Sequence, residues 1–504
     1  MGKDQSNTRI LWTGDYPALE SCFVNEVKAA RAQDRFSPLL ILVSSKLLGL
    51  HLRRHLAEKG VPHFNLRFRT LEEFAREVGT PHLLGQGKTQ VPPHADELMI
   101  GSISKSLTAK DRGFYFRDIT DHPGFHRAVL STLKDLKDAC LSPEQLDPIL
   151  SETKTAKQVH LQKVKDLLSL WKAYEKRLQD LGWYDESDVM ASACQRVKDS
   201  ACLKQAPRMI IYGFYDFNIV QKRLLQSCFD EKETVVFLPY EPARAFEYVK
   251  PTLNWLKDNG FKETPAEISE ANGRTRPLDH LCRHLFDGGK PAETSPDVVQ
   301  IISSPGEPRE VREVIREILR TSQEKGTALY EVGVLLRAPE IYSRLFRETL
   351  EGLGISSYLR EGQPLSETRA GRSLLMLLNI VNRKVSRQSV IEFATFAKLP
   401  PDRFSGAKDS SFTPSRWDAI SIHAGIVEGR KEWEERLRRL KESWAGKGEE
   451  EGEGKRRFNE GDLAAVDQLI LFAQELFKSL QPLGASNTWN RKGTVLLNTF
   501  DSFV

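Results

Sequence analysis

The amino-acid sequence predicts an α/β protein with two parallel-sheet modules, each interrupted by a largely helical insertion. Three observations support this fold class. Short apolar runs alternate with amphipathic stretches in residues 1–94, the strand signal disappears over 95–200 and then returns, and the alternation starts again after a Gly/Pro-rich linker at 287–297. Strands that alternate with helices at such spacing indicate βαβ units and a parallel sheet.

The first module is predicted from its apolar runs. Leu39–Val43 is apolar throughout, as in a parallel strand that is buried on both faces. A helix at Pro17–Arg31 begins with proline, and a helix at Leu47–Lys59 stops before Gly60. The other elements of this module are strand Arg9–Trp12, strand His63–Arg67, helix Leu71–Val78, strand Arg208–Tyr212, helix Ile219–Cys228 and strand Thr234–Leu238.

Amphipathic helices fill the insertion of the first module, and the clearest is Leu161–Leu178, where apolar residues recur at helical spacing. Beyond the linker, strands are predicted at Val298–Ser303, Val332–Leu336, Ser356–Tyr358 and Val495–Asn498, with helices at Glu307–Arg320 and Glu340–Leu353. The predicted segments are 1–94 and 201–286 for the first module, 95–200 for its insertion, 287–297 for the linker, 298–372 and 491–504 for the second module, and 373–490 for its insertion.

Composition limits the function classes. Lys plus Arg number 73 and Asp plus Glu 69, a formal net charge of +4, so affinity for nucleic acid would have to come from local basic clusters. The six cysteines are scattered without a C-x-x-C pair, which favours reduced thiols in a cytoplasmic protein. The longest apolar runs are shorter than the roughly 18 residues that cross a bilayer, so no membrane partner is expected.

Several phrases carry, by their order and spacing, a resemblance to a known family. They are LLILVSSKLLGLHLRRHL (39–56), FRTLEEFARE (68–77), KVKDLLSLWKAYEKRLQDLGWYDESDVM (163–190), MIIYGFYDFNIVQKRLL (209–225) and VGVLLRAPEIYSRLFRETLEGLGISSYL (332–359). The chain resembles the UvrD-like helicases, and its local sequence is most similar to their AddB branch. The resemblance covers nearly the whole chain. It implies that both sheet modules are RecA-like, with the fold of P-loop NTPases.

The resemblance also shows where ATP chemistry would occur, and the sequence departs from an active motor there. The loop after the first strand, TGDYPALES (13–21), keeps Gly14 but has neither the second glycine, the lysine nor the hydroxyl of a Walker A loop. Tyr212 and Gly213 stand where the Walker B strand would end in two carboxylates. Asp216, Gln221 and Arg337 match polar family positions near the nucleotide; holding domains together is the favoured interpretation for them. The sequence therefore predicts a degenerate nucleotide site.

The family suggests a DNA path and partners. Single-stranded DNA would cross the modules near Ser44, Ser45 and Lys46 and near Arg69 with Thr70, where hydroxyls and cations would hold phosphates; helix capping explains Ser44 or Ser45 equally well. AddB-like proteins work with an AddA-like helicase–nuclease subunit in recombinational repair of double-strand breaks. Many carry a C-terminal PD-(D/E)XK exonuclease domain with an iron–sulfur cluster. The end at Val504 is thus expected to make this an N-terminal fragment, and no cofactor is expected in this chain.

Other candidate motifs lack the predicted secondary structure that their chemistry would need. GQGKT (85–89) contains a Gly-Lys-Thr triplet but follows no predicted strand, and Asp135-Leu136-Lys137 lies in a helical stretch rather than on the strand that a nuclease would need. His280 and His284 are better explained by an amphipathic helix than by zinc. The predicted function is a non-catalytic, helicase-like scaffold that binds and guides DNA. Two alternatives stay open: an active ATP-dependent helicase with an atypical phosphate loop, and a structural partner-binding subunit without DNA contact.

Overall fold

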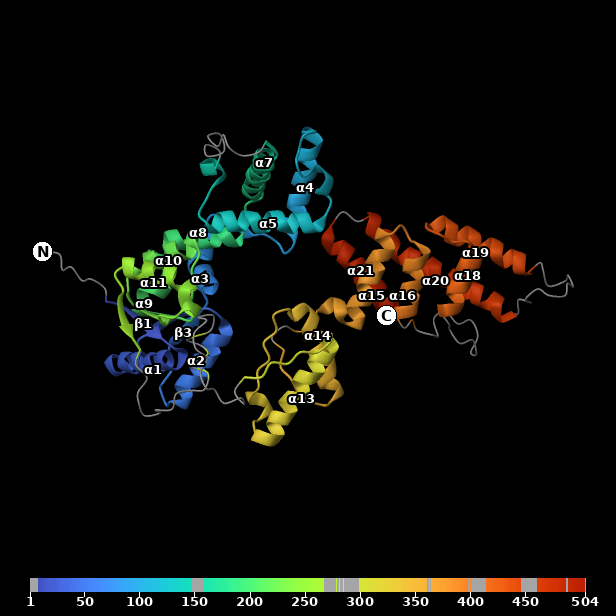
Figure 1. Cartoon of the computed structure of the whole chain (residues 1–504). Helices are drawn as coiled ribbons and strands as arrows, with labels where there is room; N and C mark the ends of the chain where they lie inside the picture. The colour runs from blue at the N-terminus through green and yellow to red at the C-terminus, as the bar shows by residue number, and fades with distance from the viewer. Residues whose placement is uncertain are drawn as a thin grey trace. The chain divides into compact units, whose positions relative to one another are not determined.

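A computed structural model describes residues 8–146, 158–266, 299–359, 364–397, 414–445, 460–485 and 488–503, together with the single residues 278, 281, 284, 362 and 399. The chain divides into two compact units, Met1–Gln300 and Ile301–Val504 (Figure 1). The predicted linker 287–297 lies outside the described residues. The predicted division of each module into core and insertion stays a prediction.

A six-stranded parallel sheet forms the centre of the first unit, which confirms a mixed α/β protein. The strand order is β3-β2-β6-β7-β1-β8, and every pairing in it is parallel. The strands are β1 (Arg9–Gly14), β2 (Leu39–Val43), β3 (Leu66–Arg69), β6 (Arg208–Tyr212), β7 (Glu233–Pro239) and β8 (Lys262–Pro265). Because the strands are parallel, all of them end at the same edge of the sheet, which is called the carboxyl edge below.

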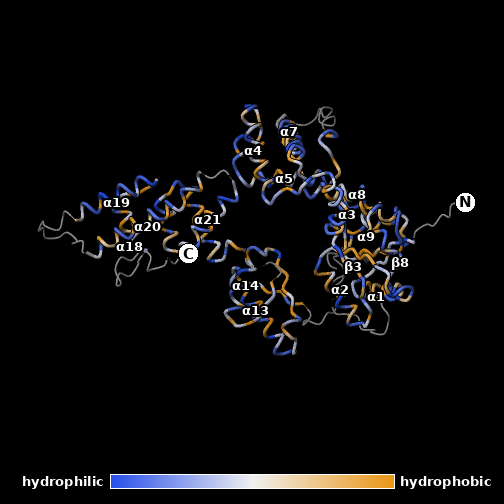
Figure 2. The backbone as a smooth tube through the Cα atoms, turned by 180° about the vertical axis from the view of Figure 1, so that it is seen from behind, coloured by the Kyte–Doolittle hydropathy of each residue, from blue (hydrophilic) through white to orange (hydrophobic). Residues whose placement is uncertain are grey.

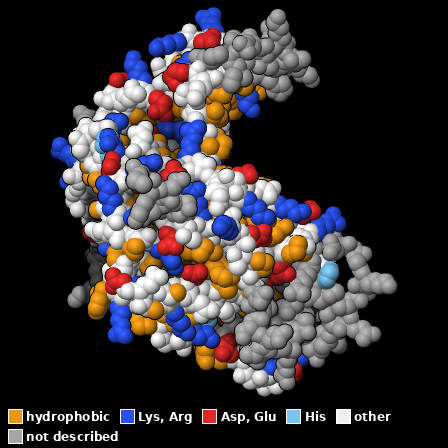
Figure 3. Space-filling view, turned by 90° about the vertical axis from the view of Figure 1, so that its left-hand side faces the viewer, with side chains coloured by type: hydrophobic (Ala, Val, Ile, Leu, Met, Phe, Trp, Pro, Cys, Tyr) orange, Lys and Arg blue, Asp and Glu red, His pale blue; other side chains and the backbone are white. Residues whose placement is uncertain are grey.

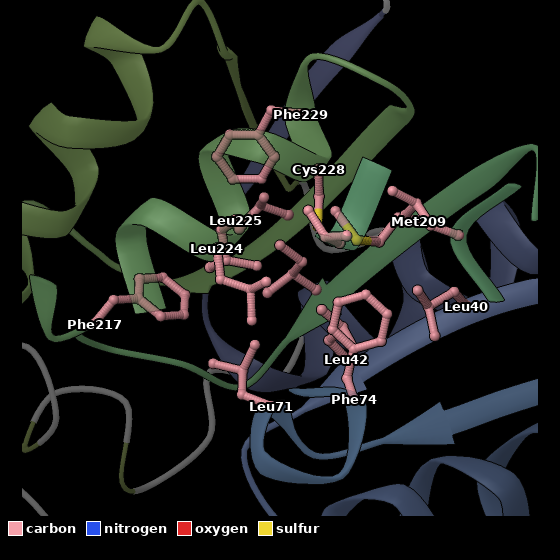
Figure 4. Packing of buried hydrophobic residues seen from close by; sticks show 14 of the residues in the cluster. Leu40, Leu42, Leu71, Phe74, Met209, Phe217, Leu224, Leu225, Cys228 and Phe229 are labelled. Carbon is pink, nitrogen blue, oxygen red and sulfur yellow. The ribbon is translucent and has the colours of Figure 1, made fainter. Parts of the chain in front are cut away.

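Helices cover both faces of this sheet. On one face, α1 (Tyr16–Gln33) and α2 (Lys46–Glu58) share a core with the odd-numbered residues of β2. On the other face, α3 (Leu71–Gly85), α10 (Ile219–Phe229) and α11 (Lys250–Asp258) share a core with Leu40 and Leu42 (Figure 4). Alternate residues of β2 thus enter two cores, which explains why this strand is apolar throughout. Figure 2 shows hydrophobic residues along the strands at the centre of this unit.

Two strands differ from the sequence prediction. β3 begins at Leu66 rather than at His63, because Asn65 adopts a left-handed φ of 56° that ends the preceding loop. β8, with the sequence KETP, was not predicted; it lies at the edge of the sheet, is largely exposed, and so lacks the apolar pattern of a buried strand. Edge strands of this kind are difficult to recognise from sequence.

The predicted helical stretch of the first unit is helical. Its main helices are α4 (Ala95–Lys110), α5 (Pro123–Asp138), α7 (Gln158–Leu181) and α8 (Glu186–Arg196), with the short parallel pair β4 (Thr89–Gln90) and β5 (Trp183–Tyr184) and the short helix α9 (Ala201–Gln205). α4, α5 and α7 share a core around the buried Trp171. α8 packs against α3, so the helical stretch is continuous with the layer that covers the sheet.

A buried ion cluster connects α5 to α7 and α8. Lys137 Nζ lies 2.8 Å from Asp185 Oδ2 and 3.1 Å from Asp188 Oδ1. It also lies 3.0 Å from Glu175 Oε1 on α7. Burial opposes the charged form of Lys137, but the three carboxylates outweigh it and raise the pKa of this lysine. The triplet Asp135-Leu136-Lys137 is therefore part of a helix, as predicted, and its lysine has a structural role.

The second unit does not confirm a second parallel sheet. Its helices are α13 (Glu307–Lys325), α14 (Pro339–Gly352), α15 (Arg369–Asn382), α16 (Arg387–Phe396), α18 (Pro414–His423), α19 (Arg430–Ala445), α20 (Glu460–Ala485) and α21 (Trp489–Phe503). The predicted strands at Val332–Leu336 and Ser356–Tyr358, and residues 299–303 of the first predicted strand, are irregular segments without strand pairing among the described residues. Leu335, for example, is 99% exposed.

The predicted strand Val495–Asn498 is wrong, because these residues lie inside α21. Leu496, Thr499, Phe500 and Phe503 face the helical core of the second unit at spacings of three and four residues. That spacing places them on one side of a helix. Among the described helices, none combines the length and the apolar character that crossing a bilayer requires.

Candidate functional site

The junction between β1 and α1 stands where the resemblance predicts a phosphate-binding loop. β1 ends at Gly14 and α1 starts at Tyr16, so a single residue, Asp15, separates strand from helix. A phosphate loop instead needs several consecutive residues whose backbone N–H groups surround the phosphates. A turn this short leaves no such stretch of backbone.

The start of α1 is already occupied by a negative charge. The Asp15 carboxylate accepts a hydrogen bond of 2.9 Å from the backbone N–H of Ala18 and caps the helix. Pro17, in the first turn, has no backbone N–H to offer. Helix N-termini attract anions through their free N–H groups and their dipole. At the N-terminus of α1, the Asp15 carboxylate already occupies the position that an anion would take.

Tyr212 and Gly213 are the residues that the resemblance predicts at the positions of the metal-binding carboxylates of a Walker B strand. Tyr212, at the end of β6, is buried against Phe23 and Phe237, with ring centroids 5.5 and 5.3 Å away. Burial raises the pKa of Tyr212, so its hydroxyl stays neutral. A neutral phenol inside an aromatic core cannot replace an ionised carboxylate as a magnesium ligand.

Gly213 follows with a φ of 81°, which L side chains rarely adopt. A Cβ atom at this position would lie 2.3 Å from Cδ2 of Leu48. Both the backbone conformation and the neighbouring side chain therefore disfavour a carboxylate here.

Tyrosines line the carboxyl edge beside this junction. The hydroxyl groups of Tyr16 and Tyr215 are in hydrogen-bond contact, and the Tyr215 ring lies 5.7 Å from that of Tyr248. Burial, followed by the bond to Tyr215, raises the pKa of Tyr16. Among the described residues, no group of three or more His, Cys, Asp or Glu side chains could hold a metal ion.

The other predicted nucleotide-site residues lie on three different segments of the chain. Asp216 is exposed on the loop after β6. Gln221 belongs to the capping box of α10, where its Oε1 accepts a bond of 3.1 Å from Asn218 N, and it lines a cavity of about 410 Å³ together with residues of α3, α5 and α8. Arg337 is exposed in the second unit. A nucleotide-related role for these three residues stays a prediction.

The candidate DNA contacts of the first unit do converge. β2 and β3 are neighbours with Leu42 opposite Arg69, so Ser44–Lys46 and Arg69–Thr70 follow adjacent strand ends at the carboxyl edge. The Ser45 hydroxyl accepts a bond of 3.2 Å from Leu48 N and caps α2. The Thr70 hydroxyl accepts one of 3.2 Å from Glu73 N and caps α3. Two helix N-termini therefore begin at this part of the edge, and both hydroxyls already serve as caps.

The two cations at this edge are paired with carboxylates of α3. Lys46 Nζ lies 3.0 Å from Glu73 Oε1, and Arg69 Nε lies 3.0 Å from Glu77 Oε2. The bond that Glu73 accepts from Thr70 N, followed by the bond from Lys46, lowers the pKa of Glu73. The T-x-x-E signature at 70–73 could have indicated Glu73 from sequence. No sequence signal indicated Glu77 or the tyrosines.

Comparisons with known proteins match this chain to one family. The family described as AddB, N-terminal, matches residues 83–249. A protein from Staphylococcus carnosus, named as a subunit of an ATP-dependent helicase/deoxyribonuclease, is 21% identical over 387 residues, which cover 72% of this chain and 32% of that protein. Proteins of the same name from Moorella thermoacetica and Bacillus subtilis are 24% and 23% identical, over 68% and 48% of this chain and 31% and 23% of theirs.

This chain is similar to AddB proteins. It spans about a third of the length of the first two relatives. Its family match begins within α3, contains the helical stretch with the Lys137 cluster, and ends after β7. Tyr212 and Gly213 thus lie inside the matched region, whereas Gly14, Lys46 and Arg69 precede it.

Proposed function

We propose that the AddB-like chain is a part of a helicase–nuclease complex that guides single-stranded DNA and does not hydrolyse ATP. The β1–α1 junction is the observation that carries this proposal, because one residue replaces the phosphate loop and its carboxylate occupies the helix N-terminus. Two like unit charges 4 Å apart repel by about 4 kcal/mol at an effective dielectric constant of 20. Triphosphate beside Asp15, with no lysine to offset the repulsion, is therefore disfavoured.

The carboxyl edge at β2 and β3 offers the better anion site. Two helices, α2 and α3, begin there, and Lys46 and Arg69 add positive charge. The Lys46 side chain is 79% exposed, and exposed ion pairs contribute only about 0–1 kcal/mol. DNA phosphates would therefore compete with Glu73 and Glu77 for these two cations, and the two carboxylates, which stay close by, would weaken that binding. Contacts of this kind hold the backbone of DNA without reading its sequence.

The name of the relatives suggests the biological setting. They are named as subunits of an ATP-dependent helicase/deoxyribonuclease. On this basis we place the AddB-like chain beside an AddA-like partner that would supply ATP hydrolysis, in cytoplasmic repair of double-strand breaks by recombination.

Retention of a labelled oligothymidylate on filters, measured over a range of salt concentrations, tests the DNA-guiding role. The logarithm of the binding constant should fall linearly with the logarithm of salt concentration, with a slope of about 0.7 per phosphate neutralised. Lys46→Ala combined with Arg69→Ala should weaken binding and reduce that slope. Lys28→Ala serves as the control, since Lys28 is exposed near the end of α1 and far along that helix from the carboxyl edge. Equal binding by all three proteins would favour the structural alternative without DNA contact at this edge.

A further inference from the structure

Two phenylalanines are prominent on the first unit, far along the strands from the carboxyl edge. The Phe36 side chain is 71% exposed and that of Phe64 is 66% exposed. Their ring centroids lie 6.1 Å apart, with an angle of 85° between the ring planes. Because the two rings contact each other, they form a small contiguous apolar patch rather than two scattered surface residues.

The pair sits at the edge where strands begin. Phe36 precedes β2 and Phe64 precedes β3, and these neighbouring strands are parallel, so both loops lie at the same edge. This edge is opposite to the one that carries Lys46 and Arg69. The pair therefore forms a surface distinct from the candidate DNA site described above.

A polar network holds both loops in place. The buried guanidinium of Arg31 donates a bond of 2.6 Å to the carbonyl oxygen of Ser37 and one of 2.7 Å to that of Phe64. Asn65, with its left-handed backbone, donates a bond of 2.9 Å from Nδ2 to the carbonyl oxygen of Phe36. Each Phe backbone carbonyl is thus bonded to a side chain of another segment. The two rings are presented on an ordered backbone, which reduces the entropy lost when a ligand binds.

The loops that carry the rings contain two exposed cations and one carboxylate. Arg35 precedes Phe36 in sequence, and Lys59 opens the loop that leads to Phe64; both side chains are exposed. The carboxylate of Asp34 accepts bonds of 2.9 Å from Phe36 N and 3.3 Å from Ser37 N, so these hydrogen bonds hold it within its own loop. Figure 3 shows one face of the molecule, on which basic and acidic side chains are interspersed.

We infer that the Phe36–Phe64 surface is a second binding site for single-stranded nucleic acid. Exposed aromatic faces stack unpaired bases regardless of sequence, and flanking cations hold the backbone. Protein interfaces are also enriched in phenylalanine and arginine, but they are depleted of lysine, and the exposed Lys59 of this surface therefore favours nucleic acid. The inference goes beyond the proposed function, since it assigns a separate surface.

Binding of two probes, an oligothymidylate and an abasic oligomer of the same length, tests the inference on the full chain. Phe36→Ala combined with Phe64→Ala should weaken oligothymidylate binding by roughly tenfold per ring, because stacking is lost. Binding of the abasic oligomer and the salt slope should stay unchanged, because the cations remain. Tyr330→Ala is the matched control, since Tyr330 is an 85% exposed aromatic residue of the second unit. Both phenylalanines are exposed, so thermal unfolding should show a folded variant.

The same measurement in the Lys46→Ala/Arg69→Ala background separates this inference from the proposed function. Residual oligothymidylate binding that requires Phe36 and Phe64 supports the second site, even if the carboxyl-edge site fails. Wild-type affinity in the Phe36→Ala/Phe64→Ala variant would overturn the inference and make a protein contact the remaining explanation for the pair. Equal weakening for both probes would also overturn it, because stacking cannot act on an abasic chain.

Discussion

Gly213 lies directly against Leu48: a Cβ atom on the glycine would stand 2.3 Å from Cδ2 of the leucine. This relationship connects the end of β6 to α2, beside the point at which the resemblance predicts a magnesium ligand in an active motor. Placing an acidic residue there requires the partly buried Leu48 side chain to shift.

Gly213→Asp should therefore destabilise the first unit. The left-handed backbone contributes about 1–2 kcal/mol, and overpacking against Leu48 about 1–3 kcal/mol more. Gly60→Ala is the control, because Gly60 has a similar φ of 65° but no heavy atom within 4 Å of an added Cβ. Urea unfolding should show a smaller loss for the control. A Gly213→Asp protein as stable as Gly60→Ala would show that Leu48 moves freely.

Lys137→Met should destabilise the helical stretch by about 3–5 kcal/mol, because it leaves buried carboxylates without their cation. Lys134→Met is the matched control on the same helix: its partner Glu186 is 3.7 Å away and both side chains are exposed. The expected loss for the control is within about 0.5 kcal/mol.

The Lys137→Met defect should also depend on pH. Burial, followed by the charge of Asp185, raises the pKa of Asp188. A carboxyl group whose pKa is higher in the folded than in the unfolded state binds protons more tightly when folded, so its effect favours folding at low pH and opposes it as pH rises. Lys137 lowers the pKa of Asp188, so removing the lysine raises that pKa further and strengthens the pH dependence. The difference in unfolding free energy from wild type should therefore shrink on acidification, and a constant difference would contradict a charge-based role.

Glu73 should show the opposite pH dependence. Its pKa is lowered from 4.5 by the bond from Thr70 N and by Lys46. The stabilisation of the folded state by ionised Glu73 is therefore fully present above pH 4.5 and is lost as pH falls through the folded-state pKa. Glu73→Gln keeps a capping-box acceptor but removes the charge, whereas Glu73→Ala removes both and should cost about 1 kcal/mol near neutrality. Thermal unfolding of the three proteins between neutral and acidic pH checks this. The advantage of wild type over Glu73→Gln should fade below pH 4.5.

The sequence identified the elements whose side chains must be buried. Leu39–Val43 was predicted with its observed bounds, because a central parallel strand is apolar on both faces. Val495–Asn498 was misassigned, because a run of four residues is too short to distinguish strand from helix, and the pattern that decides it extends to Phe503. β8 was missed because an exposed edge strand has few apolar constraints.

The candidate site was predictable in part, for a related reason. The sequence itself shows that the loop after Gly14 lacks the Walker A lysine and that Tyr212 and Gly213 replace the Walker B carboxylates. The side chains that lie beside these residues could not be predicted, since they come from segments far apart in the chain, such as Tyr16 with Tyr215. The ion pairs of Lys46 and Arg69 likewise depend on the packing of α3 beside β2.

Titration of the AddB-like chain with fluorescent Mg·ATP, in the presence and absence of single-stranded DNA, tests whether the chain binds and hydrolyses ATP. Asp15→Asn is the informative variant, because asparagine caps helices as well as aspartate does while removing the charge. We expect a flat titration and no phosphate release for wild type. We expect the same for Asp15→Asn, since the phosphate loop, its lysine and the metal-binding carboxylates are still lacking. Saturable binding that unlabelled ATP displaces, together with DNA-stimulated hydrolysis, would contradict this expectation.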